Sequence, residues 1–423
     1  MSDLPRETRA YRGIPLPVIA VALAVGATLL GDSMLYAVMP SRPEAWALSV
    51  PAVGILLSVN RLVRLVTNSV AAWIIERFGQ RLPFVAALLL AVLVTLCYGW
   101  TTAFVVLLVA RMGWGLCWST LRLGAFWTVL SEASDDNRGL LLGSYQAIVR
   151  MGSVAGALVG AALTDAFGHR PTLTLFAAVM AATAAVWILS NRGRARGERS
   201  PQPRGGGDLR AVLGDRRLLV TGSGILITGL VFSGLVTASL GFYLSSHFGQ
   251  QIAILGIALG VTSATGIMLG VQWSLGLPLA PVLGHLSDRF GRIPLISGGF
   301  ALGASGLLAL ALTQSIWLML PAVLAAFVAS TALTVSLTAT AGDLAPPERR
   351  SAVVSSYATF ADLGSALGPL IGLSFASLAT LRGLYGTAAL LLLVAALLFR
   401  VAFRSGRPRE AQAAGDNRSE DAR

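Results

Sequence analysis

Seven charged side chains lie inside long apolar stretches, where an ionised group is costly unless it faces water or an opposite charge. Two are acids and five are arginines: Asp32, Asp362, Arg61, Arg64, Arg111, Arg122 and Arg150. A carboxylate there can exchange protons with its surroundings, and an arginine fork can hold a carboxylate or phosphate group. These residue types therefore predict proton exchange and recognition of a charged small molecule.

Helical spacing brings several of these groups onto shared faces. Arg61, Arg64 and Asn68 lie three and seven residues apart, which places them on one helical face. The same period groups Arg111 with Gly115, Trp118 and Arg122, and Gln146 with Arg150. At a rise of about 1.5 Å per residue, Asp32 and Arg111 fall at similar depth in the outer third of a bilayer. We expect these two to pair, and Asp362 to pair with Arg61 or Arg64 near mid-membrane.

Five deep arginines against two deep acids leave a surplus of positive charge. Arginine stays protonated, so the surplus favours an organic anion, or an amphiphile with an anionic head, over a cation. In the alternative, some arginines pair with Glu132 or Asp343, and the pocket is neutral and suits apolar compounds. The tryptophans that could line such a pocket are Trp114, Trp118 and Trp273.

The surrounding sequence has the composition of a polytopic membrane protein. Of its 423 residues 55% are hydrophobic and 12% charged, and the mean hydropathy is +0.73. Runs of roughly 20 apolar residues can each cross about 30 Å of hydrocarbon, and backbone in lipid must be helical to satisfy its hydrogen bonds. The sequence predicts an all-α fold with twelve such helices, at 14–38, 49–75, 82–101, 104–130, 140–163, 171–190, 217–245, 251–283, 294–313, 317–341, 352–378 and 382–403.

The net charge of +12 comes from arginine alone, because the chain has no lysine. If the amino terminus is cytoplasmic, 24 of the 32 arginines lie on the cytoplasmic side and only Arg42, Arg170 and Arg382 on the other. This asymmetry follows the positive-inside rule and predicts that both termini are cytoplasmic. Because the arginines alternate with spans, they form no nucleic-acid-binding face. We expect a multi-pass protein of the plasma membrane, such as a bacterial inner membrane.

The sequence lacks the residue patterns that several kinds of chemistry require. Without lysine there is no Walker A motif for nucleotide binding, and no nucleophile elbow is present. Cys97 and Cys117 both fall inside predicted spans, and the three histidines are far apart. The sequence therefore predicts a protein that is not an enzyme and has no cofactor or metal site.

A duplicated loop divides the chain into two halves. AWIIERFGQR at 72–81 and GHLSDRFGRI at 284–293 are separated by 212 residues. The same offset relates Arg138, Tyr145, Gly152, Gly156 and Gly160 to Arg350, Tyr357, Gly364, Gly368 and Gly372. One offset through two distant patterns predicts two matching six-helix units. The expected domains are a cytoplasmic segment 1–13, a half at 14–190, a polar linker at 191–216, a half at 217–403 and a disordered tail at 404–423.

The duplicated loop carries a resemblance to the major facilitator superfamily, over about residues 14–403. The second copy follows that family's pattern Gly-x-x-x-Asp-Arg-x-Gly-Arg-Arg closely, and the first copy has Ala72 and Glu76 in place of the Gly and Asp. The resemblance implies a gate in which Glu76 addresses the start of the eleventh helix, near Arg349 and Arg350. The gating residues so implied are Glu76, Arg77, Gly79, Arg81, Asp288, Arg289, Gly291 and Arg292.

Two further motifs are similar to those of the family's drug/proton antiporter-like branch. Arg111 to Gly115 reads like its Arg-x-x-x-Gly motif, which is associated with proton coupling. Glycines at 143, 152, 156 and 160 are similar to its exporter motif, although Ala157 replaces the proline. The glycines would also serve close helix packing. The resemblance slightly favours export.

These observations predict a secondary active transporter that moves a small organic compound by alternating access. They also predict protons as the coupling ion, a lipid bilayer as the setting and a monomeric protein. The predicted proton-coupling residues are Asp32, Arg111 and Asp362. The predicted substrate-binding residues are Arg61, Arg64, Arg150, Gln146, Trp118, Tyr243, Gln272 and Trp273. Two alternatives stay open at this point: an importer of an organic anion by symport, and a non-transporting membrane sensor or receptor on the same fold.

Overall fold

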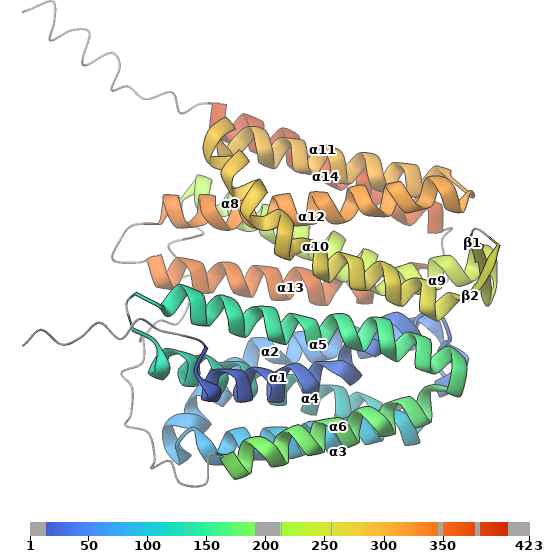
Figure 1. Ribbon diagram of the computed structural model, residues 1–423. Helices are drawn as coiled ribbons and strands as arrows, with labels where there is room; N and C mark the ends of the chain where they lie inside the picture. Colours follow the sequence, from blue (N-terminus) through green and yellow to red (C-terminus); the bar gives the residue numbers. More distant parts are fainter. Residues whose placement is uncertain are drawn as a thin grey trace, which may run out of the picture. The chain divides into compact units, whose positions relative to one another are not determined.

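The computed structural model describes residues 14–134, 136–190, 212, 214–254, 256–345, 350–376 and 381–404 (Figure 1). The predicted amino-terminal segment, most of the linker, Arg349 and the tail after residue 404 lie outside these ranges. The connections at 39–49 and 249–260 lie on the side that the arginine distribution predicts to be external, and we call that side the outer face.

Twelve long helices make up the described part of the chain, as the sequence predicted. Those of the first half are α1 (Leu16–Val38), α2 (Val50–Phe78), α3 (Arg81–Trp100), α4 (Phe104–Glu132), α5 (Arg138–Phe167) and α6 (His169–Ser190), with a 3-10 turn η1 (Pro43–Trp46). The seventh is continuous through α8 (Arg216–Thr228), the π-helix η2 (Gly229–Val236) and α9 (Thr237–Phe248). The others are α10 (Val261–Phe290), α11 (Arg292–Leu312), α12 (Ile316–Leu344), α13 (Arg350–Ala376) and α14 (Leu381–Arg404).

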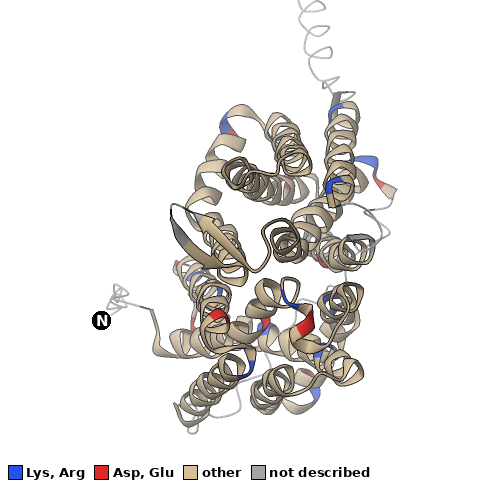
Figure 2. Ribbon diagram, turned by 90° about the vertical axis from the view of Figure 1, so that its right-hand side faces the viewer, with Lys and Arg blue, Asp and Glu red and all other residues tan. Residues whose placement is uncertain are grey.

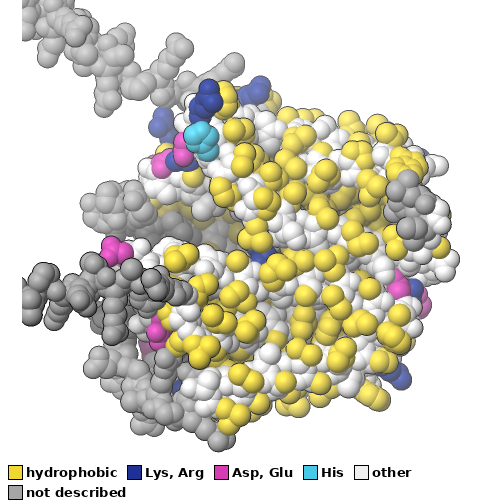
Figure 3. Space-filling model, viewed as in Figure 1, with side chains coloured by type: hydrophobic (Ala, Val, Ile, Leu, Met, Phe, Trp, Pro, Cys, Tyr) yellow, Lys and Arg dark blue, Asp and Glu magenta, His cyan; other side chains and the backbone are white. Residues whose placement is uncertain are grey.

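The helices carry apolar side chains outward as well as inward. Among the described residues, eleven helices are long and apolar enough to cross a membrane, and large side chains such as Leu93, Leu318 and Leu390 are exposed. Hydrophobic side chains cover much of the visible face, and charged ones gather towards its two ends (Figure 3). Such a surface is suited to lipid.

The predicted start of the eighth span is wrong. The chain after α9 forms an antiparallel hairpin of β1 (Gln251–Ile254) and β2 (Ile257–Gly260), and α10 begins only at residue 261. Gly256 has φ of +81°, which a tight hairpin turn needs and most other residues avoid. Apolar residues in a hairpin raise the hydropathy as much as helical ones do, so a hydropathy window cannot separate the two.

The turns after α2 and α10 have the same conformation in both copies of the duplicated loop. Gly79 ends α2 with φ of +77°, and Gly291 ends α10 with φ of +89°. Glycine is the residue that adopts positive φ at no steric cost. The repeated pattern therefore produces a repeated backbone geometry, 212 residues apart.

The glycines of α5 allow its backbone to contact α1 closely. A Cβ on Gly152 would lie 2.1 Å from the carbonyl oxygen of Gly26, and one on Gly156 would lie 2.4 Å from that of Leu30. In the second half, a Cβ on Gly368 of α13 would lie 2.4 Å from the carbonyl oxygen of Leu230 in η2. Small residues allow this approach in membrane helices, so these three glycines serve close helix packing.

The contacts divide the chain into two compact units that differ from the two sequence halves. One unit comprises the described residues up to 202 together with Gly229–Pro278 and Asp362–Leu384. The other comprises the described residues of Pro203–Thr228, Leu279–Ala361 and those after Tyr385. α10 and α13 each contribute one end to each unit. All contacts of the site described below lie within the first unit.

Candidate functional site

A cavity of about 270 Å³ lies among α1, α2, α4, η2 and α13. Its lining combines two acids, two arginines, three aromatic rings and small polar groups: Leu29, Asp32, Tyr36, Asn60, Arg61, Arg64, Trp114, Trp118, Ser233, Asp362 and Ser365. Viewed along the helices, the ribbon shows few charged residues among many uncharged ones (Figure 2). The cavity therefore brings together four of the seven charged residues that the sequence placed inside apolar stretches.

Asp32 and Arg111 form the pair that the sequence predicted. Arg111 Nη1 donates to Asp32 Oδ1 at 2.5 Å, and Arg111 Nε donates to the carbonyl oxygen of Leu56 at 3.0 Å. The guanidinium also lies 5.7 Å from the ring centroids of Tyr36 and Tyr98. Arg111 is fully buried, whereas Asp32 faces the cavity. A charge-assisted bond thus holds a cavity carboxylate against a buried cation.

Asp362 and Arg64 form the second pair. Arg64 Nη2 lies 3.2 Å from Asp362 Oδ1, so of the two predicted partners, Arg61 and Arg64, it is Arg64 that meets the acid. This pair joins α2 of the first sequence half to α13 of the second. Both side chains line the cavity, and their exposed fractions are only 14% and 19%. In such surroundings the ion pair is screened weakly by water.

Arg61 has main-chain partners instead of a carboxylate. Its Nη1 donates to the carbonyl oxygens of Ser233 in η2, at 2.9 Å, and Ser365 in α13, at 3.0 Å. Its guanidinium lies 5.1 Å from the ring centroid of Tyr36, a cation–π distance. Arg61 therefore connects the first sequence half to two helices of the second while keeping its full charge.

Some polar atoms at this site have no hydrogen-bond partner among the described residues. They are Asn60 Oδ1, Arg64 Nε and Arg111 Nη2, all buried. Asn60 and Arg64 line the cavity itself. Buried polar groups are normally satisfied, so these atoms mark places that suit water or a polar ligand.

The other predicted substrate residues do not line this cavity. Arg150 Nη1 donates to the carbonyl oxygen of Trp273 at 3.4 Å, and Gln272 Oε1 accepts from Thr237 Oγ1 at 3.2 Å. Tyr243 is buried and its ring contacts His247. Gln146 is exposed. Spacing along one helix placed these residues towards the interior, but their distance from the cavity depends on how the helices pack.

The remaining deep arginine, Arg122, lies on a polar strip beside the cavity residues. Its Nη2 donates to Asn68 Oδ1 at 3.4 Å, and the same oxygen accepts from Ser119 Oγ at 2.8 Å. Asn68 thus extends the face of Arg61 and Arg64, as helical spacing predicted. Asp343, which the sequence offered as a partner for deep arginines, pairs instead with Arg292.

The duplicated loops form local contacts. Arg292 lies 3.7 Å from Asp288 Oδ1, one helical turn away, and also contacts Asp343 at the end of α12. Arg289 lies over the ring of Phe290, and Glu76, Arg77 and Arg81 are exposed. The predicted contact of Glu76 with the start of α13 joins residues of different units and stays a prediction.

A polar cluster at the outer face was not predicted. Asp165, near the end of α5, accepts from Arg42 Nη2 at 2.7 Å, from the backbone N–H of Ser263 at 2.8 Å and from Ser263 Oγ at 2.6 Å. It also accepts from Thr262 Oγ1. A carboxylate is stabilised at a helix N-terminus, here that of α10. Asp165 stands just beyond the predicted fifth span, and only the fold brings its partners together.

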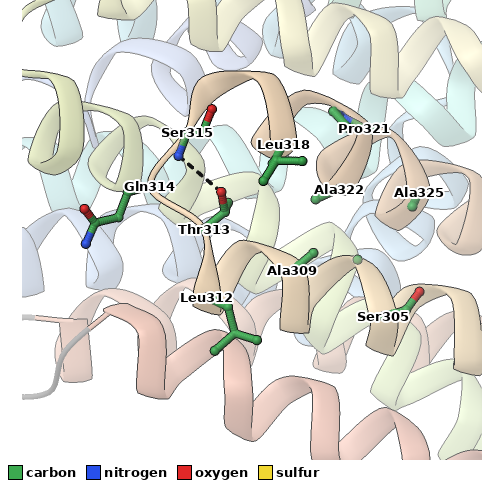
Figure 4. A pocket seen from close by; sticks show the side chains of 11 residues that line it. Ser305, Ala309, Leu312, Thr313, Gln314, Ser315, Leu318, Pro321, Ala322 and Ala325 are labelled. Atoms are coloured by element: carbon green, nitrogen blue, oxygen red, sulfur yellow. Dashed lines mark hydrogen bonds between the residues drawn. The ribbon is translucent and has the colours of Figure 1, made fainter.

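A larger hollow of about 800 Å³ lies in the second unit, between the ends of α11 and α12. The residues that line it are uncharged, and Ser315 N donates to Thr313 Oγ1 in the connecting turn (Figure 4). It contains none of the predicted site residues. We therefore place the functional site at the smaller, charged cavity.

The helical fold and this charged cavity define a membrane transport protein. The chain belongs to the Major Facilitator Superfamily, whose sequence model matches residues 21–276 and 258–421. The resemblance seen in the sequence is thereby confirmed at the level of the family.

Curated relatives match parts of the chain. It is 34% identical over 128 residues, 29% of its length, to the inner membrane transport protein YajR of Escherichia coli (strain K12). It is 23% identical over 242 residues, 56% of its length, to a human synaptic vesicular amine transporter. These alignments cover 25% and 44% of the two relatives, so the chain spans less than half of either.

Solved structures show the same fold over nearly the whole chain. A bacterial homolog of the human lysosomal transporter Spinster, inward-facing and occupied, aligns with a TM-score of 0.76 and 16% identity, over 92% of this chain and 96% of its own. The nucleoside transporter NupG aligns with a TM-score of 0.78 and 12% identity, over 93% and 100%. At these identities the likeness concerns the fold alone.

Proposed function

We propose that this transporter is a proton-coupled secondary carrier that binds a small organic anion, or an amphiphile with an anionic head, in the charged cavity. The observation that carries the proposal is the arrangement of Asp32, Arg61, Arg64 and Asp362 around one cavity. Intramembrane charges that face a cavity are characteristic of substrate and proton pathways. The proposed setting is a plasma membrane with both termini in the cytoplasm.

Proton coupling is proposed for the carboxylates of the two ion pairs. Each acid faces the cavity, and each is held by one arginine, Arg111 or Arg64. An adjacent arginine favours the ionised carboxylate, and loss of that contact favours the protonated form. A substrate that draws the arginine away would therefore change the proton occupancy of the acid. Asp32 is the first candidate and Asp362 the second.

Substrate charge follows from the balance of the cavity and its immediate neighbours. Arg61, Arg64 and Arg111 oppose Asp32 and Asp362, and after the two pairs are formed Arg61 keeps its charge. An anionic group is attracted to that charge, and Tyr36, Trp114 and Trp118 offer surface to an apolar or aromatic body. A volume of about 270 Å³ suits a small molecule.

Alternating access is proposed to involve the outer cluster. Within the first unit, the cluster at Asp165 and the carbonyl bonds of Arg61 join the two sequence halves. Opening of the outer face has to break these bonds, and closure has to re-form them. Export remains slightly favoured over import by the glycine motif of α5.

A second candidate is transport of an organic cation. The cavity sets two carboxylates beside three aromatic rings, a combination that also suits an ammonium group. One partial relative is named as an amine transporter. Against this reading, both carboxylates are already occupied by arginine.

The two candidates differ in a binding experiment with matched compounds. Purified protein is titrated with benzoate, benzamide and benzylamine, which share a ring and differ in charge. The proposal predicts binding of benzoate in preference to the other two. Preference for benzylamine would support the cation reading, and equal affinity for benzamide would indicate a neutral pocket.

A further inference from the structure

We infer that the main-chain carbonyls of Ser233 and Ser365 are stand-in ligands of Arg61, and that an anionic substrate replaces them. In this inference Arg61 determines the preference for an anion. Arg61 also links binding of the anion to separation of α2 from η2 and α13. The inference rests on the proposed function and assigns it to one side chain.

The three arginines of the site have different partners. Arg111 and Arg64 each hold a carboxylate. The bonds of Arg61 go to two carbonyl oxygens through one nitrogen, Nη1. A guanidinium presents a fork of donors, and its strongest bonds are to ionised oxygens, roughly twice as strong as neutral ones. Arg61 is thus the arginine that gains most when a carboxylate or phosphate oxygen enters.

The backbone at Ser233 is unusual, which supports a role in movement. Ser233 lies within the π-helix Gly229–Val236, and Thr237 Oγ1 donates to Phe232 O, five residues earlier, at 2.9 Å. π-helical turns are rare and are often found at functional sites. They can revert to α-helical geometry with a change of register. A carbonyl presented by such a turn is suited to a contact that forms and breaks.

The packing around Arg61 shows what its release would loosen. A Cβ on Gly54 of α2 would lie 2.8 Å from the carbonyl oxygen of Pro369 in α13, so the helices are in close contact on the outer side of Arg61. Gly234 of η2 and Gly368 of α13 also contact each other closely. The two elements that Arg61 bonds, η2 and α13, therefore contact each other, and α13 also contacts α2. Loss of the two carbonyl bonds removes the polar links that Arg61 makes from α2 to η2 and α13, and the Arg64–Asp362 pair remains between α2 and α13.

The position of Arg61 also specifies the form of the ligand. The guanidinium lies against the ring of Tyr36, and Trp114 and Trp118 line the same space. An anionic group at Arg61 would place the rest of a small molecule beside these rings. The inferred class is a small organic acid with a flat apolar body, for which benzoate is a suitable test compound.

The experiment measures binding and outer-face distance in the same protein. Spin labels are placed at Glu44→Cys and Gln251→Cys, both exposed on the outer face, with Cys97 and Cys117 replaced by alanine. Full-length protein in nanodiscs is examined by electron–electron double resonance with no ligand and with benzoate. Arg61→Gln is the test variant. Arg122→Gln is the control, because Arg122 is also deep but bonds to Asn68 outside the cavity lining.

In the labelled parent we expect benzoate to increase the population with a long outer distance. Arg61→Gln should show that long-distance population without ligand, should not respond to benzoate, and should bind benzoate at least about tenfold more weakly. Arg122→Gln should behave as the parent. The inference is overturned if Arg61→Gln binds benzoate as the parent does, or if its ligand-free distances match those of the parent.

A failure of the proposed function gives a different result. If the parent binds benzylamine and not benzoate, the anionic substrate is wrong and so is the stand-in role. The ligand-free comparison of Arg61→Gln with the parent would then still show whether Arg61 holds the outer face closed. If benzoate binds through Arg61 but moves no protons, the inference holds and the coupling proposal fails.

Discussion

At the scale of single residues, substitutions of Asp32 can distinguish a role in proton coupling from a structural role. Asp32→Asn keeps an oxygen that can accept from Arg111 but cannot take up a proton. We expect this variant to lose transport driven by a pH gradient and to keep ligand binding, while its melting temperature falls less than that of Asp32→Ala, because the hydrogen-bond acceptor for Arg111 is kept. Transport in proteoliposomes at several imposed gradients, together with a melting curve, measures both quantities.

Asp32→Ala is the matched structural comparison. It removes the acceptor and leaves the fully buried Arg111 without its carboxylate. Breaking a buried pair in this way costs about 3–5 kcal/mol, so the melting temperature should fall clearly. Proton-driven transport at the parent rate in Asp32→Asn would reject Asp32 as the coupling residue and make Asp362 the next candidate.

At the scale of elements, the contact between α1 and α5 depends on glycine at specific positions. Gly152→Ala places a Cβ against the backbone of Gly26, where the fold has no room for it. We expect a loss of stability of about 1–3 kcal/mol, seen as a lower melting temperature. Gly143→Ala is the control on the same helix, because a Cβ there meets nothing within 4 Å. Equal melting temperatures of the two variants would contradict the close packing.

The elements were largely predictable because the requirement for a helix in lipid leaves few alternatives. Eleven of the twelve spans begin and end within about four residues of the predicted limits, the margin expected for boundaries read from sequence. The exception is the hairpin before α10, where residues suited to strands continue the apolar run. The pairs Asp32–Arg111 and Arg64–Asp362 were also accessible, since depth along a helix restricts which charges can meet.

Contacts made by the main chain were not accessible from the sequence. The bonds of Arg61 go to carbonyl oxygens, which every residue has, so the residue types in the sequence do not indicate these bonds. Likewise, the partners of Asp165 are a loop arginine and the first turn of α10, which hydropathy had placed ten residues too early. Such sites depend on how helices approach each other, and that is a property of the packed bundle.

At the scale of the whole molecule, the outer cluster predicts how the transporter closes. Asp165→Ala removes the acceptor shared by Arg42 and the N-terminus of α10. We expect a larger population with an open outer face, detected as a longer distance between labels at positions 44 and 251. For this experiment Arg170→Gln serves as the control, because it changes an outer-side charge outside the cluster. Unchanged distances in Asp165→Ala would show that the cluster does not contribute to closure.

The central claim, that movement of an organic anion through the charged cavity is coupled to movement of protons, is tested most directly by proton flux. Parent protein and Asp32→Asn are reconstituted in proteoliposomes containing a pH-sensitive dye, and benzoate, benzamide or benzylamine is added. Empty liposomes correct for passive permeation of the compounds. The account predicts that only benzoate causes protein-dependent proton movement in the parent, and that Asp32→Asn shows none. Proton movement with benzylamine alone, or equal movement in both proteins, would contradict it.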